Sequence, residues 1–295
     1  MRIGALEAGG TKMVMGIFDG EGRSLETETI PTRAPEKTVP ELIDWFRREK
    51  IDALGIGTFG PVNLKKDSPS YGTITSTPKA GWRGYPLLTM LTDALNVPAA
   101  IDTDVNAAAI AECRMGAAKD CRSAVYVTVG TGIGAGIVVN GEPVHGLVHP
   151  EVGHMLMRPH PMDPMPQGVC PYHESCLKGL ASGPALSKRA GRSAEELPDG
   201  DPIFTLEANY LAQMCVNLIL TVSPEKIMIG GGVLQRSFML DRIRKITVEL
   251  LGGYVQAPEV NARIDRYIVL PKLFPISGLI GAYLLGREAL TGEKE

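Results

Sequence analysis

Short apolar runs alternate along the chain with longer stretches whose hydrophobic residues recur every three or four positions. The short runs predict strands, and the longer stretches predict amphipathic helices. In the first part of the chain the expected strands are Ile3–Leu6, Met13–Phe18, Ser24–Ile30, Ala53–Thr58 and Ala99–Ile101, and the expected helices are Val39–Glu49, Pro86–Asn96 and a helix from Asp104 to about Ala117. Asp19-Gly20 after the second run is a hairpin signal.

The same order of elements then begins again. A strand at Ala124–Val129 runs into a glycine-rich turn, a second strand reaches Ile137–Val139, and Asn140-Gly141 favours a tight hairpin turn. Helices are expected at 202–222, 237–251 and 277–290, with strands at Lys226–Ile229 and Tyr267–Leu270. This repetition predicts two related α/β halves facing each other across a cleft, where ligands commonly bind.

Residues 158–176 interrupt the alternation. They have no periodic pattern and contain a run of prolines, at positions 159, 161, 164, 166 and 171. Proline excludes both a helix interior and a central strand. A loop of this length inside a compact domain is either mobile or held by a cross-link.

Four candidate metal ligands surround this proline-rich loop. His154 precedes Cys170, His173 and Cys176, and the last three follow a C-x2-H-x2-C spacing. Zinc prefers four nitrogen and sulfur ligands in a tetrahedron, and four protein ligands close its coordination shell. The pattern therefore predicts a structural zinc ion that staples the loop 154–176. The alternative is a chance grouping of two cysteines and two histidines on a surface loop.

The net charge and the cysteine content limit the binding partners and the cellular compartment that the sequence predicts. The chain has 33 acidic and 30 basic residues, so its formal net charge is −3. It lacks the excess of positive charge that binding to nucleic acid or to an anionic membrane requires. Five cysteines in 295 residues favour a reducing compartment over a disulfide framework. Neither a secretory signal nor an uninterrupted apolar run of about 18 residues is apparent. A soluble cytoplasmic protein is expected.

Glycine is abundant, at 34 of 295 residues, and it gathers in turns that could hold phosphate. Glu7–Lys12 joins the first two strands, and Val129–Gly136 occupies the equivalent place in the second half. Each could direct backbone N–H groups and a threonine hydroxyl at phosphate oxygens; alone, each could also be a tight hairpin. The P-loop motif is absent, and the second turn leads into a strand, so a Rossmann site is rejected.

Three further positions have a functional and a structural interpretation. Gly230–Gly232 could let a purine lie against bare backbone, or could be a plain strand-to-helix turn. Asp104 could be a general base at the end of a strand, or only the N-cap of the helix that follows. Glu151 could bind sugar hydroxyls, or could be a solvated surface acid.

Together these motifs resemble the ROK family of sugar kinases, and most closely its bacterial fructokinase branch. The residues that carry the resemblance span almost the whole chain: Glu7–Lys12, Thr75–Lys79, Asp104, Val129–Gly136, Glu151–His154, Cys170, His173, Cys176, Leu180–Ala185 and Gly230–Gly232. The resemblance implies two ribonuclease-H-like domains of the actin-like ATPase fold around a central cleft. They would comprise residues 1–117, which the C-terminal helix 281–295 could join, and residues 118–280.

The resemblance also implies roles for individual residues. The γ-phosphoryl group of Mg²⁺-bound ATP would pass to a hexose, above all to the 6-hydroxyl of fructose, with Asp104 as general base. Sugar contacts would come from Gly60, Thr103, Glu151 and His154. Nucleotide contacts would come from Gly9, Gly10, Thr11, Lys12, Thr131, Gly132, Pro184, Gly230, Gly231 and Gly232. Structural zinc would bind at His154, Cys170, His173 and Cys176, and a homodimer is expected.

Three positions depart from the family pattern. Glu7 replaces the aspartate that is common in the first phosphate motif, and Thr103 replaces an asparagine beside the catalytic aspartate. Lys178 stands where the family usually has a sugar-site glutamate. This charge reversal could change the choice of sugar, or the side chain could point away from the sugar.

Other functions stay open on the sequence. Glucose, mannose or N-acetylmannosamine could replace fructose as acceptor without a change in chemistry. A non-catalytic sugar-binding protein is a second class, although the family's repressors carry an additional helix-turn-helix ahead of the first glycine motif. A zinc hydrolase is a third class, but it needs an open metal position that four ligands would close.

Overall fold

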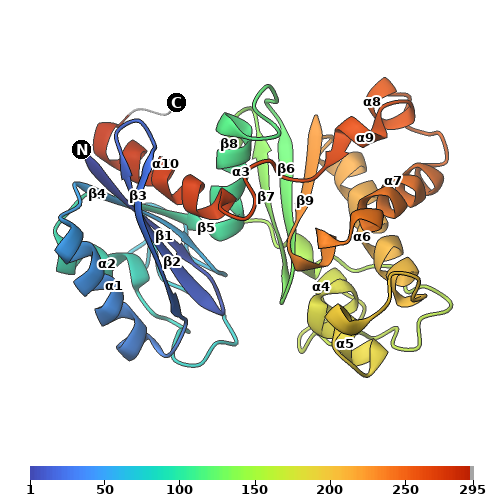
Figure 1. Ribbon diagram of the computed structural model, residues 1–295, viewed down its shortest axis with the longest axis horizontal. Coiled ribbons are helices and arrows are strands. Elements are labelled where there is room, and N and C mark those ends of the chain that lie inside the picture. The colour runs from blue at the N-terminus through green and yellow to red at the C-terminus, as the bar shows by residue number, and fades with distance from the viewer. Residues whose placement is uncertain (293–295) are drawn as a thin grey trace. The chain divides into compact units, whose positions relative to one another are not determined.

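The computed structural model describes residues 1–292, which form ten strands and ten α-helices in a mixed α/β arrangement, so the expected fold class is confirmed. Residues 293–295, the end of the expected helix 281–295, lie outside the described residues. The chain separates into two compact units and contains two five-stranded sheets (Figure 1). The first contains Met1–Gly116, Glu142–His149 and the chain from Pro275, and the second contains Ala117–Gly141 and Pro150–Phe274.

One short segment groups differently from the expected division. Glu142–His149 was expected in the second half and belongs to the first unit. It does so because it packs on α3 (Asp104–Met115) and because its two histidines form hydrogen bonds with Asp102 and Val62. The C-terminal helix α10 also belongs to the first unit, and it begins at Ser277, where the periodicity of the sequence predicts the helix 277–290.

The first sheet has the strand order β3-β2-β1-β4-β5. Its strands are β1 (Arg2–Ala8), β2 (Lys12–Asp19), β3 (Ser24–Pro31), β4 (Ala53–Thr58) and β5 (Ala99–Thr103). β1, β4 and β5 run parallel, so their carboxyl ends meet at one edge, while β2 runs antiparallel to both of its neighbours, β1 and β3. In register across that edge, Glu7 pairs with Gly57 and Gly57 pairs with Asp102.

Helices cover both faces of this sheet (Figure 1). The helices are α1 (Pro35–Glu49), α2 (Leu87–Leu95), α3 (Asp104–Met115) and α10 (Ser277–Thr291). Apolar residues of α1 and α2, among them Leu42, Phe46 and Leu91, form one core with the alternate residues Leu6 and Ile56 of the strands. The helices α3 and α10 pack on each other, and α10 packs on β4.

Glycine permits the close approach of α10 to the sheet. A Cβ added to Gly55 in β4 would lie 1.8 Å from the Ala282 carbonyl oxygen and 2.3 Å from the Gly286 nitrogen. A Cβ on Gly281 would lie 1.9 Å from the carbonyl oxygen of Ala107 in α3. Backbone therefore packs on backbone here, at separations that no larger residue allows.

The second sheet has the strand order β10-β9-β6-β7-β8. Its strands are β6 (Ala124–Val129), β7 (Ile133–Val139), β8 (Glu142–Pro143), β9 (Lys226–Gly230) and β10 (Ile268–Val269). β6 and β7 form an antiparallel hairpin, and β9 lies parallel to β6. β7 begins earlier than expected, so the glycine-rich turn shortens to Gly130–Gly132 and Ile133–Gly136 are strand residues.

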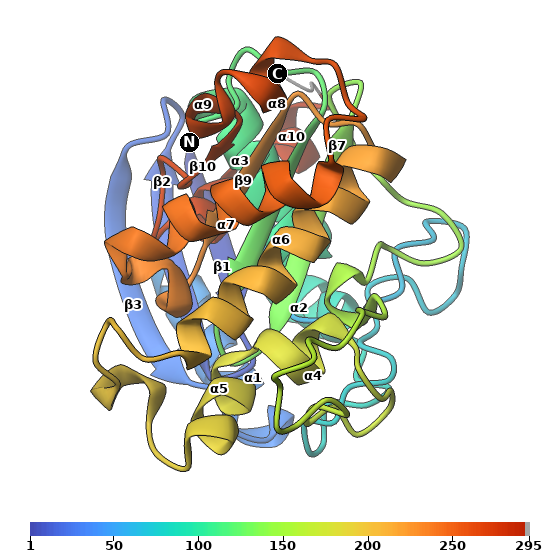
Figure 2. The ribbon, with the colours of Figure 1, turned by 90° about the vertical axis from the view of Figure 1, so that its right-hand side faces the viewer.

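The long helices α6 and α7 pack against each other over this sheet (Figure 2). The helices of this unit are α4 (Leu177–Ala181), α5 (Gly183–Ala190), α6 (Ile203–Thr221), α7 (Ser237–Leu251), α8 (Pro258–Asn261) and α9 (Ile264–Tyr267), with 3-10 turns η1 (Val152–His154), η2 (Ala194–Glu196) and η3 (Gly232–Gln235). Within residues 1–292, α6 alone is long and apolar enough to span a membrane, but 67% of its apolar window is buried inside the protein, as in a core helix.

Two differences from the expected elements have local causes. α1 begins at Pro35 instead of Val39, because proline fits the first turn of a helix, where an N–H has no intrahelical acceptor. α4 and α5 were not expected, since each is shorter than the span over which helical periodicity is visible.

Candidate functional site

The first glycine turn lies between β1 and β2 at the carboxyl edge of the first sheet. The Gly9 N–H donates to the Lys12 carbonyl at 3.0 Å, and Thr32 bonds to the backbone on both sides of Gly10. A Cβ at Gly10 would meet no atom within 4 Å, so the tip of the turn is open. The ammonium of Lys79 donates to the Gly10 carbonyl and adds a positive charge beside the tip.

Glu7 lies at the same edge, at the end of β1. Burial raises the pKa of the Glu7 carboxyl, and the nearby Lys12 partly opposes that rise. The carboxylate packs against the first turn of α10, where a Cβ on Gly278 would lie 2.6 Å from Oε1. Glu7 is thus held at a helix N-terminus, where a negative charge is favoured.

Asp104 is the first residue of α3, directly after β5, and is not the N-cap that the sequence allowed. The cap is Thr103, whose Oγ1 accepts the Asn106 N–H at 3.0 Å. Asp104 Oδ1 accepts a hydrogen bond from the backbone N–H of the next residue, Val105, at 2.9 Å. Thr103 is only 2% exposed, and its hydroxyl already accepts a hydrogen bond from the helix. It is therefore a weaker candidate for a contact with the sugar.

Asp102, the residue before this cap, is 3% exposed and anchors a polar cluster that the sequence analysis missed. It accepts hydrogen bonds from the Thr103 N–H at 2.7 Å and the Asn106 amide at 2.7 Å. The His145 Nε2 lies 2.9 Å from the second oxygen. The Glu142–His149 segment is therefore fastened beside Asp104. No spacing rule links residues so far apart in the chain, so only the fold reveals the cluster.

Gly60 lies on the loop after β4, beside a small cavity of about 140 Å³. The cavity is lined by Pro61–Lys65, Thr75 and His145–His149. His149 Nε2 accepts the Val62 N–H at 3.2 Å, and a Cβ on Gly60 would lie 3.1 Å from the same ring. The close approach of the imidazole explains why glycine stands at position 60.

The second glycine turn, between β6 and β7, has an open tip as well. The Gly130 N–H donates to the Gly132 carbonyl at 2.9 Å, and the Gly183 N–H, at the start of α5, donates to the Gly130 carbonyl at 2.8 Å. A Cβ at Gly130 would meet no atom within 4 Å. Thr131 is exposed at the tip, and so is Pro184 in the first turn of α5.

Gly230–Gly232 lie at the same end of the second sheet. Gly230 ends β9, in register with Thr128 of β6. Gly231 has a φ of +100°, and a Cβ there would lie 2.3 Å from the Val129 carbonyl oxygen, so both conformation and contact require glycine. Gly232 has no atom within 4 Å of a built Cβ, which leaves bare backbone accessible to a ligand.

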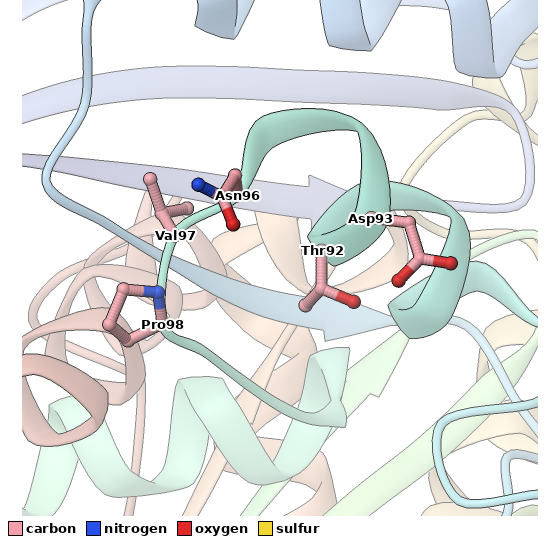
Figure 3. Close-up of a pocket in the computed structure, with 5 residues that line it drawn as sticks. All are labelled: Thr92, Asp93, Asn96, Val97 and Pro98. Carbon is pink, nitrogen blue, oxygen red and sulfur yellow. The ribbon is translucent and has the colours of Figure 1, made fainter.

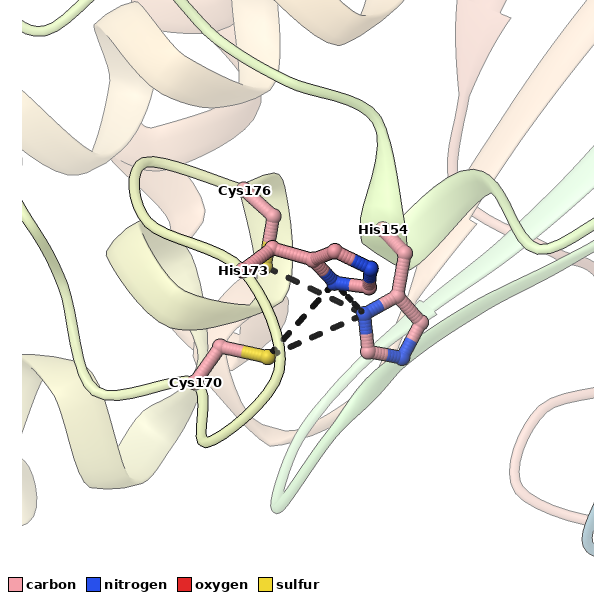
Figure 4. Close-up of side chains that lie close together, drawn as sticks. All are labelled: His154, Cys170, His173 and Cys176. Atoms are coloured by element: carbon pink, nitrogen blue, oxygen red, sulfur yellow. Dashed lines mark hydrogen bonds between the residues drawn. The ribbon is translucent and has the colours of Figure 1, made fainter. Parts of the chain in front are cut away.

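His154, Cys170, His173 and Cys176 come together as the sequence predicted (Figure 4). Their ligand atoms all lie within 4.8 Å of one another. The two Nδ1 atoms are 3.1 Å apart, and the Cys170 and Cys176 sulfurs lie 3.8 and 3.9 Å from His154 Nδ1. A tetrahedral zinc site needs about 3.4 Å between nitrogens and about 3.6 Å between nitrogen and sulfur. The group therefore fits a metal ion.

The pKa shifts in this cluster differ from residue to residue. Burial lowers the pKa of His154, with Lys178 and His173 adding to the effect, and a neutral imidazole is the ligand form. Burial raises the pKa of the Cys176 thiol. It also acts to raise that of Cys170, but the Tyr172 and His173 N–H groups outweigh it and lower the pKa.

Glu151 is positioned by the turn that carries the first candidate metal ligand. It precedes η1, and its carbonyl accepts the His154 N–H at 2.9 Å. The turn packs on the start of β7, because a Cβ on Gly153 would lie 2.0 Å from the Ile133 carbonyl oxygen. Glu151 and the second glycine turn are therefore at the same end of the second unit.

A second polar anchor in the proline-rich loop was missed by the sequence analysis. Asp163, inside the loop, pairs through both oxygens with the Arg189 guanidinium at 2.9 Å each. Tyr210 of α6 donates to the same carboxylate at 2.6 Å. The loop is thus held by a buried ion pair as well as by the Cys/His group. No periodicity in the sequence reports such a contact.

A larger depression at the end of α2 involves none of these residues (Figure 3). It measures about 620 Å³, is widely open, and is lined by Thr92, Asp93, Asn96, Val97 and Pro98. It contains neither a cluster of titratable groups nor a glycine turn. We therefore take the residues at the sheet end of each unit, described separately above, as the candidate functional residues.

Comparison with known proteins gives the family. Residues 3–289 match the ROK family. The chain is 40% identical to fructokinases of Pediococcus pentosaceus, covering 98% of this chain and 99% of that protein, and of Zymomonas mobilis, covering 97% and 96%. The structure resembles a ROK family glucokinase from Streptomyces griseus in complex with glucose and AMPPNP, with a TM-score of 0.78, 26% identity and coverage of 98% and 100%. The chain therefore belongs to the ROK family, as its motifs predict.

Proposed function

We propose that this protein transfers the γ-phosphoryl group of Mg²⁺-bound ATP to D-fructose and forms fructose 6-phosphate. The observation that carries the proposal is the position of Asp104. It begins α3 directly after β5, at the sheet edge that also carries Glu7 and the first glycine turn. A carboxylate and a phosphate-binding turn at one edge are what a general base and a phosphoryl donor require.

In this proposal Asp104 accepts the proton of the attacking sugar hydroxyl. Gly9, Gly10, Thr11 and Lys12 contact the phosphates through open backbone, a hydroxyl and a charge. Mg²⁺ would neutralise the developing charge on the phosphates. The Glu7 carboxylate, at the same edge, is the residue that would hold its water ligands.

Residues of the second unit complete the proposed roles. Thr131, Gly132 and Pro184 would take phosphate. Gly230–Gly232 would lie against the adenosine through Gly232, where a Cβ would meet no atom within 4 Å and the backbone is open. Of the four sugar contacts expected from the sequence, Gly60, Glu151 and His154 remain in the proposal, whereas the Thr103 hydroxyl is engaged in capping α3. Among these three, Glu151 offers an acceptor suited to sugar hydroxyls.

We also propose that the Cys/His group holds a structural zinc ion. Two sulfurs and two nitrogens fill a tetrahedron, so no position is left for a substrate or a reactive water. The ion would fix the proline-rich loop and the turn that carries Glu151. A cytoplasmic location suits Mg-ATP chemistry and five free thiols. A homodimer is part of the proposal.

The test is ADP release with Mg-ATP over fructose, glucose, mannose and N-acetylmannosamine. Turnover with fructose well above the other sugars supports the proposal. Turnover with another sugar keeps the kinase chemistry and refutes the choice of fructose. Zinc-loaded, folded protein that turns over no sugar would instead be a sugar-binding protein without catalysis.

A further inference from the structure

Lys178 lies beside the second glycine turn. It is in α4, two residues after the metal-ligand candidate Cys176. Its Cε is 3.7 Å from the point that a Cβ on Gly132 would occupy. The side chain therefore runs toward the turn proposed to bind phosphate.

The surroundings of the turn are otherwise empty on this side. A Cβ on Gly130 would meet nothing within 4 Å, and for Gly132 the sole neighbour within that distance is Lys178. Hydrogen bonds through the Gly130 carbonyl hold the turn against the start of α5, directly after α4. Lys178 is thus the side chain that approaches the turn at Gly132.

The Lys178 charge has no carboxylate to neutralise it. No acidic side chain in the described part of the chain, residues 1–292, forms an ion pair with its ammonium. The two cysteine thiolates nearby would be balanced by the zinc ion that they bind, because Zn²⁺ and two thiolates sum to zero. The ammonium therefore remains a net positive charge on a side chain that reaches the turn at Gly132.

We propose that Lys178 binds the phosphate chain of the nucleotide at the second glycine turn, rather than the sugar. The inference rests on the proposed function, because it takes that turn as a phosphate site. An ammonium makes strong charge-assisted hydrogen bonds to phosphate oxygens.

Binding measured without turnover tests this assignment. Lys178→Gln, Lys178→Glu and Lys178→Arg are titrated by calorimetry with Mg-AMPPNP and, separately, with adenosine. We expect Mg-AMPPNP binding to weaken about tenfold or more in the Gln and Glu variants, the usual effect of losing a charged hydrogen bond. Adenosine affinity should stay within twofold of wild type, and Arg should retain most of the Mg-AMPPNP affinity.

The matched control is Lys188→Ala, on the exposed face of the neighbouring helix α5. It removes the same charge from the same unit, and its Mg-AMPPNP affinity should equal that of wild type. Zinc content and melting temperature are measured for each variant, so that loss of the loop is not mistaken for loss of a phosphate contact. The Arg variant keeps the test decisive if the Gln variant folds poorly.

Two results would overturn the assignment. Unchanged Mg-AMPPNP affinity in both the Gln and Glu variants would show that Lys178 does not bind phosphate. A changed KM for fructose with unchanged nucleotide affinity would return the residue to the sugar site. If the wild type binds Mg-AMPPNP but phosphorylates no sugar, the proposed function fails, while the calorimetric comparison still decides the role of Lys178.

Discussion

The carboxylate of Asp163 and the guanidinium of Arg189 form a two-point ion pair with side chains that are 0% and 1% exposed. The Tyr210 hydroxyl donates to the same carboxylate at 2.6 Å and accepts the His160 N–H at 3.0 Å. A loop segment with five prolines is thereby fixed to α5 and α6 by polar contacts inside the protein.

Breaking this pair from one side should strongly destabilise the protein. Asp163→Asn leaves the Arg189 charge buried without a counter-charge, which typically costs about 3–5 kcal/mol. Urea unfolding at pH 7 measures the loss. Glu259→Gln, which removes an exposed i,i+4 pair with Arg263, is the control and should cost less than about 0.5 kcal/mol. A similar cost for both variants would contradict this role.

The same pair predicts a pH dependence. Burial acts to raise the pKa of Asp163, but the hydrogen bonds from Arg189 and Tyr210 outweigh it and hold the pKa below its usual value. The folded state then binds a proton less readily than the unfolded state. The stabilisation is complete above about pH 4, the ordinary aspartate pKa, and is lost as the pH falls further. In Asp163→Asn, the unfolding free energy should fall less steeply as the pH is lowered below about 4.

The buried carboxyl group of Glu207 predicts the opposite dependence of stability on pH. It is fully buried in α6, and neither carboxyl oxygen has a hydrogen-bond partner. Burial raises its pKa well above the usual value, against the opposing charge of Arg189. Between the unfolded and the folded pKa the unfolded state alone ionises, so stability falls as the pH rises through that window.

Glu207→Gln should therefore remove part of the fall in stability between pH 5 and pH 8. We expect a difference of about 1–3 kcal/mol, because each unit by which the folded and unfolded pKa values differ is worth about 1.4 kcal/mol. Unfolding free energies at both pH values measure it, and at pH 4 the variant and the wild type should be close. Parallel pH profiles for the two proteins would show that Glu207 is not the source.

Asp104→Asn tests the general base. The amide keeps the shape of the side chain but cannot accept the sugar proton, so kcat should fall by about 10²–10⁴-fold. Fructose and Mg-AMPPNP affinities should stay within a few-fold of wild type. Asp93→Asn, in the depression at the end of α2, is the control and should keep full turnover. Near-normal kcat in the Asp104 variant would refute the base assignment.

Removal of the metal should loosen the proline-rich loop. Cys176→Ser, or treatment with a strong chelator, should lower the zinc content from one ion per chain and reduce the melting temperature, since metal binding stabilises the folded site. Cys121→Ser, at a half-buried cysteine outside the cluster, should keep both values. Protein purified without added zinc that contains no metal and is equally stable would rule out the structural ion.

Gly55→Ala tests the close packing of α10 on the sheet. Its methyl group would lie 1.8 Å from the Ala282 carbonyl oxygen, so backbone must move. Overpacking of this kind costs about 1–3 kcal/mol or more. Gly200→Ala, where a Cβ would meet nothing within 4 Å, should leave the unfolding free energy within about 0.5 kcal/mol. Equal stability of both variants would mean that α10 adjusts freely.

By itself, the sequence determined the class of fold, the family and most of the elements, because these depend on local patterns. Ala53–Thr58 and Ala124–Val129 are strands with the expected bounds, since short apolar runs beside glycines have few other structures. The Cys/His spacing likewise predicted the four-residue cluster that the structure shows. Three of its members, Cys170, His173 and Cys176, are close together in the sequence, so a short loop brings them together.

Only the tertiary structure decided features that depend on residues distant in the chain. It placed Thr103 at the N-cap in place of Asp104, bonded His145 to Asp102, and paired Asp163 with Arg189. It also directed Lys178 toward Gly132, a choice that the sequence left open. Such contacts arise from the packing of whole elements, and the energy of a buried pair or a close backbone approach is not encoded in any short pattern.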